Sequence, residues 1–240
     1  MNIPEQESNQ FESFEINHKK LQYDLSNKIL ATVMMQLFIT SVLNIIAYNS
    51  SFLSSIIRHL SILWMLGTVI SSGILYFSRS FSKKVPINYA LLLIFTVSES
   101  FALHNIIMNI SPEIILTALF ITTISISFLY YVAKNVEFNF TSFKFMTSFL
   151  IGHMLMNLVS LFFFGFNTIY IYISTLSFCV YIVVDLQLII GDKEKKFTTD
   201  DYIHASILLY SDIIILFIKI VQMLEKISND KKEKDKKKKK

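Results

Sequence analysis

Two aspartates stand inside apolar runs near the C-terminal end of this sequence. Asp185 lies in IVVDLQLII and Asp212 lies in LLYSDIIILF. An ionised aspartate at the centre of a membrane-spanning helix costs about 2.5 to 3.5 kcal/mol on insertion scales, so an acid there marks a candidate functional site. Two acids in neighbouring runs indicate a polar site more strongly than either acid alone.

The spacing lets these acids meet if the two runs form antiparallel helices. Asp185 lies six residues before Gly191, and Asp212 lies ten residues after Tyr202, which corresponds to about 9 and 15 Å of helix rise. Two carboxylates about 4 Å apart repel by about 4 kcal/mol at an effective dielectric constant of about 20. At neutral pH such a pair holds one proton and titrates as a unit. Protonated, it would join the helices; ionised, it would part them and open a polar path.

Arg79 and Glu99 are further candidates for this site. Arg79 can reach inward and form an ion pair with either aspartate, or it can anchor its helix at the lipid headgroups. Glu99 is either a third member of the polar site or an acid that a hydroxyl or amide on a facing helix satisfies. The chain has no glycine-rich phosphate loop and no spacing typical of a resident metal, so we expect no enzyme activity and no cofactor.

The composition is typical of a membrane protein. Of the 240 residues, 53% are hydrophobic and 14% aromatic, with only 5 Gly and 3 Pro, and the mean hydropathy is +0.52. These values exclude a soluble domain and a disordered chain. The charges gather at the two ends and in short loops, so they bear on membrane orientation, and we expect no nucleic-acid partner.

Seven apolar runs predict an all-α membrane protein with seven transmembrane helices. Gln36 and Asn44 lie eight residues apart, on nearly one face, which predicts that the first helix turns this face into the bundle. Small residues between Gly67 and Gly73 allow close approach of a neighbouring helix. The runs cover residues 29–48, 60–77, 87–107, 114–132, 143–164, 169–190 and 203–224. They define a polar cytosolic segment (1–27), a membrane domain (28–224) and a lysine-rich tail (225–240).

The distribution of Lys and Arg predicts a cytosolic N-terminus, because the short loops on the opposite side hold only Arg58. The N-terminal side holds Lys19, Lys20, Lys28, Arg79, Lys83, Lys84, Lys134, Lys144, Lys193, Lys195 and Lys196. The tail NDKKEKDKKKKK conflicts with seven crossings, which would place it on the other side. Either the tail is translocated, or the last run, which contains Asp212 and Lys219, dips into the membrane and returns.

Several motifs around the two aspartates resemble those of the transmembrane Bax inhibitor motif family, which includes the Bax inhibitor and lifeguard proteins. They are VVDLQLII, DDYIHASILLY and LYSDIIILF followed by IVQMLEK. Weaker similarity extends upstream through SRSFSKKVPINYALLLIFTVSES and MNISPEIILTALFITT. Val184, Ser211 and Ile215 depart from the residues common in the family at these positions.

The resemblance implies a seven-helix bundle around a central last helix. It implies a pH-sensitive calcium leak in which Asp185 and Asp212 form the gate and hold the passing ion, while Arg79 latches them. It further implies suppression of cell death, a location in the endoplasmic reticulum or Golgi membrane, and membrane or apoptosis-regulating proteins as partners besides the lipid bilayer and calcium ions.

Two other functions compete with the leak. In the first, the chain regulates cell death by binding proteins through its tail and loops, without conducting ions, and the acids only hold the bundle together. In the second, the acids act as the general acid and base of an intramembrane aspartyl protease. The protease hypothesis is weak, because Asp212 lacks the Gly-x-Gly-Asp setting of such enzymes.

Overall fold

The computed structural model describes residues 5–77, 81, 83–162, 167–190 and 201–238, and within these ranges it contains helices and no strand. The predicted all-α class is therefore confirmed. The helices are α1 (Glu5–Asn49), α2 (Ser51–His59), α3 (Ser61–Phe77), α5 (Ile87–Ile107), α6 (Pro112–Asn135), α7 (Phe143–Phe162), α8 (Asn167–Ile190) and α9 (Tyr202–Lys238).

Five helices in the described ranges are long and apolar enough to cross a membrane, so the chain is an integral, multi-pass membrane protein. They are Lys20–Asn49 of α1, Ile87–Ile107, Pro112–Asn135, Ile171–Ile190 of α8 and Tyr202–Lys232 of α9. Helices α2 and α3 form a sixth crossing if they act together, with a bend of 66° between them. The fifth predicted run lies at α7 (Phe143–Phe162), and the described residues do not confirm the predicted count of seven crossings.

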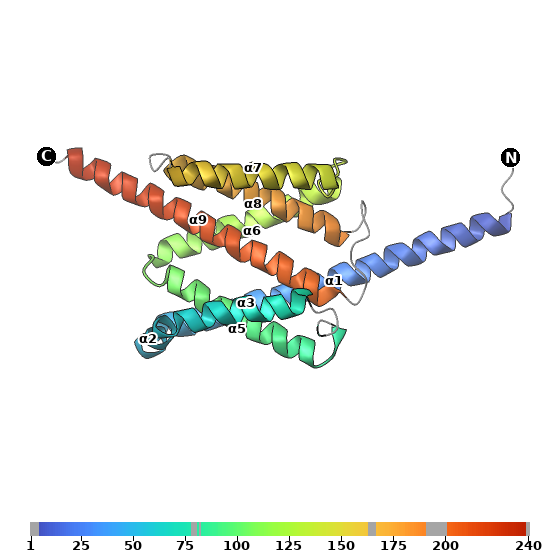
Figure 1. Ribbon diagram of the computed structural model, residues 1–240, viewed down its shortest axis with the longest axis horizontal. Coiled ribbons are helices and arrows are strands. Elements are labelled where there is room, and N and C mark those ends of the chain that lie inside the picture. The colour runs from blue at the N-terminus through green and yellow to red at the C-terminus, as the bar shows by residue number, and fades with distance from the viewer. Residues whose placement is uncertain (1–4, 78–80, 82, 163–166, 191–200, 239–240) are drawn as a thin grey trace.

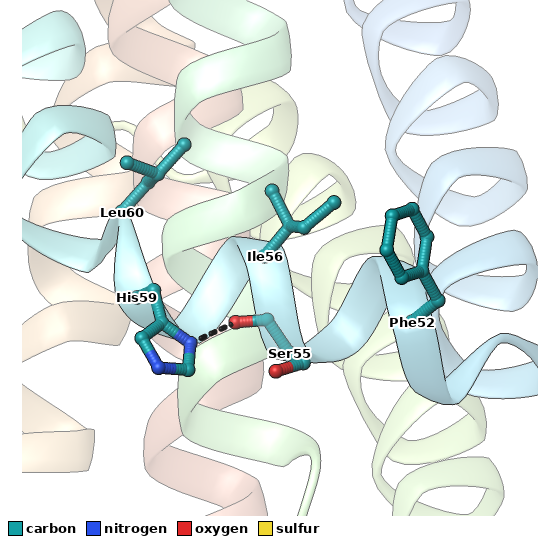
Figure 2. A pocket seen from close by; sticks show the side chains of 5 residues that line it. All are labelled: Phe52, Ser55, Ile56, His59 and Leu60. Atoms are coloured by element: carbon teal, nitrogen blue, oxygen red, sulfur yellow. Dashed lines mark hydrogen bonds between the residues drawn. The ribbon is translucent and has the colours of Figure 1, made fainter.

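Helix α2 was not predicted, because the second predicted span begins only at residue 60. Its start is fixed by the side chain of Ser50, which accepts a hydrogen bond from the backbone N–H of Leu53 at 3.3 Å and so caps the helix. The helix buries Ile57 and leaves Phe52 77% exposed. One face of α2 lines an open pocket of about 320 Å³, formed with Leu60 (Figure 2). Sequence reasoning missed α2 because it searched for runs long enough to cross a bilayer.

Helix α9 is central, as the resemblance implied. It packs against α1, α3, α5, α6 and α8, and Figure 1 shows it passing between α6 and α8 on one side and α1, α3 and α5 on the other. A helix with neighbours on all sides must be apolar almost all round. Accordingly, its buried residues include Ile203, Ala205, Ile207, Leu209, Tyr210, Ile214, Leu216, Phe217, Ile220 and Val221.

The last helix also corrects one alternative left open by the sequence. Its 37 residues form one unbroken helix, about 55 Å long, so it does not dip into the membrane and return. The N-terminal part of α1 and the C-terminal part of α9 project from opposite ends of the bundle (Figure 1). The lysine-rich tail, as far as Lys238, continues α9 as helix.

Close packing of α3 on α5 occurs at one of the two glycines that the sequence singled out. A Cβ atom added at Gly67 would lie 2.5 Å from Oγ of Ser98, whereas one added at Gly73 would meet nothing within 4 Å. The absence of a Cβ at Gly67 therefore allows α3 to approach Ser98 of α5 closely, and Gly73 has no such role.

Candidate functional site: an acid pair between α8 and α9

The structure brings Asp185 of α8 and Asp212 of α9 together, and their carboxyl groups share a hydrogen bond. A carboxylate only accepts hydrogen bonds, so this contact requires a proton on one of the two acids. Oδ2 of Asp212 is buried and receives no hydrogen bond from a donor group in the described part of the chain. The acids thus form a protonated pair in a largely apolar seam between two helices.

The C-terminal end of α8 holds Asp185 rigidly. Its neighbours Val184 and Leu186 are buried. Gln187 follows Asp185 by two residues. Its Nε2 donates to the carbonyl oxygen of Phe138 at 3.0 Å, and its Oε1 accepts from the backbone N–H of Phe140 at 3.0 Å. One amide therefore ties α8 to the connection between α6 and α7. The sequence signal for this role is an amide inside an apolar run, which by itself does not indicate a partner.

Two other ionisable side chains face the pair. His204 of α9 lies close enough to Asp185 to interact electrostatically, and Tyr181 of α8 does so with Asp212. A positively charged imidazole would favour an ionised Asp185. His204 stood in the quoted motif DDYIHASILLY, but the sequence alone gave no reason to place it near an acid one helix away.

The predicted latch residue, Arg79, lies outside the described residues. Two contacts between described residues hold the start of α9. Lys83 forms an ion pair with Asp201 at 3.3 Å, and the hydroxyl groups of Tyr89 and Tyr202 form a hydrogen bond of 2.6 Å. These contacts join the beginnings of α5 and α9, at the end of the bundle where the sequence predicts the cytosol.

Glu99 lies on α5 and faces α3. Its side chain forms a hydrogen bond with the hydroxyl of Thr68 on α3, and it interacts electrostatically with Tyr210 of α9. This contact corresponds to the alternative in which a hydroxyl on a facing helix satisfies the acid.

The acid pair suits a passing cation better than a resident metal ion. The described residues contain no group of three or more His, Cys, Asp or Glu side chains that could hold a metal. Calcium prefers oxygen ligands such as carboxylates, and it binds six to eight oxygen atoms in all. Two aspartates alone leave most of that shell to water.

A second set of polar contacts, here called the neutral cluster, lies between α1, α5 and α9. Gln36 donates from Nε2 to Oγ1 of Thr96 at 3.1 Å, and Asn44 donates from Nδ2 to Oγ of Ser100 at 3.1 Å. The hydroxyl oxygens of Thr40 and Tyr210 are 2.7 Å apart. The prediction that Gln36 and Asn44 turn one face of the first helix into the bundle is confirmed. All members are hydroxyl or amide groups.

Comparison with known proteins agrees with the motifs around the acids. The sequence model of the family described as "Inhibitor of apoptosis-promoting Bax1" matches residues 23–230. The chain belongs to this Bax inhibitor family. The resemblance read from the sequence is thereby confirmed.

Relatives come from fungi, plants and animals. The chain is 31% identical to Bax inhibitor 1 of Schizosaccharomyces pombe over 223 residues, which cover 88% of this chain and 80% of that protein. It is 35% identical to Protein LIFEGUARD 4 of Arabidopsis thaliana over 149 residues, 59% of this chain and 58% of that protein. It is 22% identical to Protein lifeguard 3 of Homo sapiens over 228 residues, 90% of this chain and 73% of that protein. The match to LIFEGUARD 4 thus spans little more than half of that protein.

Proposed function

We propose that this protein is a pH-sensitive cation leak of an internal membrane, with calcium as the transported ion and the pair Asp185 and Asp212 as its gate. The observation that carries the proposal is the hydrogen bond between the two carboxyl groups, which joins α8 to α9. Membership of a family described as inhibiting the apoptosis-promoting protein Bax supports a role in cell death, which a slow loss of stored calcium would serve. The endoplasmic reticulum or Golgi is the proposed location.

The gate works through the shared proton. While the pair holds it, the bond keeps α8 and α9 together. When the proton leaves, two carboxylates about 4 Å apart repel by about 4 kcal/mol at an effective dielectric constant of about 20. The helices then separate, and the exposed carboxylates attract cations, as acidic rings do in cation channels. The leak should therefore increase as the pH rises.

The side of the membrane that supplies the proton follows from the position of the pair. Asp185 lies five residues before the end of α8 and Asp212 ten residues after the start of α9. The count of Lys and Arg in the loops assigns this end to the cytosol. The gate would then respond to cytosolic pH.

The test is calcium flux into vesicles that contain the purified full-length protein, measured over a range of pH. In Asp212→Asn the amide can still bond to Asp185 but cannot share its proton, so the increase of flux with pH should disappear. Asp230→Asn is the matched control, because Asp230 is an acid of the same helix that forms an ion pair with Lys226 in partly exposed positions. An Asp212→Asn protein with the wild-type flux and pH response would refute the proposal.

One observation favours a second candidate function, regulation of cell death by protein binding without conduction. Helix α9 carries its lysine-rich sequence as helix to Lys238, away from the bundle (Figure 1), where it can bind an acidic partner. Deletion of residues 231–240 should then abolish protection from cell death while calcium flux in vesicles stays unchanged. Loss of flux and protection together in Asp212→Asn would favour the leak.

A further inference from the structure

A lysine lies inside the last apolar helix, on the same seam as the acid pair. Lys219 of α9 donates from Nζ to Oγ of Ser174 on α8 at 2.9 Å, and Nζ lies 5.3 Å from the ring centroid of Phe178. Ser174 is buried, with 2% of its surface exposed. A lysine near the end of a membrane helix commonly extends to the headgroups. Here the ammonium is instead held by a buried hydroxyl and an aromatic ring.

The lysine and the acids line one continuous seam. On α9, Lys219 follows Asp212 by seven residues, which is two turns along the same face and about 10 Å of rise. On α8, the facing side chains are spaced four, three and four residues apart, which again marks one face. They are Ser174, Phe178, Tyr181 and Asp185. Since Tyr181 interacts with Asp212 and Ser174 bonds to Lys219, the seam runs from the acid pair, past aromatic rings, to the ammonium.

We propose that Lys219 is a fixed positive barrier in this seam, which a cation must pass after it leaves the acid pair. This inference rests on the cation leak proposed above and adds the residue that sets its rate and its preference among ions. The Coulomb energy between two charges is proportional to their product. The barrier that Lys219 raises is therefore twice as high for a divalent as for a monovalent ion, and it holds calcium flux at a low level.

The doubled energy gives a quantitative test, because rates depend exponentially on barrier height. If removal of the Lys219 charge increases potassium flux by a certain factor, calcium flux should increase by about the square of that factor. A tenfold increase for potassium would accompany an increase of about a hundredfold for calcium. A change in pore width or in helix packing has no reason to follow this relation.

The experiment compares potassium and calcium flux in vesicles containing wild-type protein or Lys219→Met, which keeps the length of the side chain and removes the charge. Lys219→Arg keeps the charge and the hydrogen bond and should leave both fluxes unchanged. Lys231→Met is the matched control, because Lys231 is an exposed lysine of the same helix on a different face from Lys219. Ser174→Asp is a second test variant, which leaves Lys219 in place and cancels its field.

Larger fluxes in Lys219→Met and Ser174→Asp, with the squared relation between the two ions, would support the barrier. Unchanged fluxes in both variants, in preparations where Asp212→Asn still alters the pH response, would overturn the barrier and leave the leak standing. Equal factors for potassium and calcium would also overturn it, because a charge cannot act equally on both ions. Absence of any flux in the wild type would refute the leak itself, before the lysine variants are compared.

Discussion

The α8–α9 seam and the neutral cluster are both polar contacts inside a membrane helix bundle, yet their chemistry differs. The seam contains Asp185, Asp212 and Lys219, whose charges depend on protonation. The neutral cluster contains hydroxyl and amide groups, such as Thr40 and Gln36, which keep the same hydrogen bonds over the physiological pH range. The seam contains titratable members, whereas the members of the neutral cluster do not titrate in this range, and the acid that faces the cluster is Glu99, beside Tyr210.

Both regions act on the same helix. Tyr210 and Asp212 are two residues apart on α9, which places them about 200° apart around the helix axis. Tyr210 bonds to α1 through Thr40 at 2.7 Å, and Asp212 bonds to α8 through Asp185. Helix α9 is therefore bonded to α1 on one side and joined to α8 on the other by a contact that depends on a shared proton. Under the proposed gate, the end of α8 that carries Asp185 moves away from α9 while α9 stays bonded to α1.

The largest expected effect is a pH-dependent change in helix separation on one side of α9 only. Spin labels at the exposed positions Leu176 of α8 and Gln222 of α9 should move apart by several ångströms as the pH rises, in a protein whose Cys179 is replaced by alanine. Labels at Phe38 of α1 and Gln222 should keep their distance. Pulsed electron paramagnetic resonance measures both pairs.

The control for this separation is Asp212→Asn, in which the first pair of labels should also keep its distance. If both pairs of labels moved apart by the same amount, the proposed difference between the two regions would be wrong, because the contacts of the neutral cluster would then open together with the seam.

A smaller effect is expected at the close contact between α3 and α5. Gly67→Ala should destabilise the protein by about 1–3 kcal/mol, because its Cβ would lie 2.5 Å from Oγ of Ser98 and an overpacked contact costs that much. Gly73→Ala, on the same helix and with open space around it, should stabilise by about 0.5–1 kcal/mol. Thermal unfolding in detergent at two pH values measures both.

Ser98→Ala should restore most of the stability lost in Gly67→Ala, since it removes the nearest atom. The flux of Gly67→Ala should keep its wild-type pH response. A shifted response would show that the α3–α5 contact belongs to the gate.

The smallest effect concerns a single bond of the neutral cluster. Tyr210→Phe removes the 2.7 Å contact with Thr40, and hydrogen bonds between membrane helices contribute about 0.6 kcal/mol on average. A double-mutant cycle with Thr40→Val, followed by thermal unfolding, should give a coupling energy of this size at acid and neutral pH alike. A coupling energy that depends on pH would contradict the division into a switchable and a neutral region.

Much of the fold could be predicted because it depends on local composition. Apolar runs predicted helices, and the helical class is correct. The bend between α2 and α3 was missed, because it depends on a capping serine and on the burial of Ile57. The unbroken course of α9 could not be read from charges in its sequence, since neighbouring helices shield Asp212 and Lys219 from lipid.

The sequence by itself determined that ionisable residues stand in helices that must cross lipid, because the cost of placing a charge in hydrocarbon belongs to each residue separately. The sequence thus singled out Asp185 and Asp212, and it showed Lys219 as a charged residue in the last apolar run. The tertiary structure decided what each of them contacts: the acids contact each other, Lys219 contacts Ser174, and Gln187 contacts the connection between α6 and α7. The physical reason is that such contacts depend on the rotation and register of one helix against another, which only the packing of the whole bundle fixes.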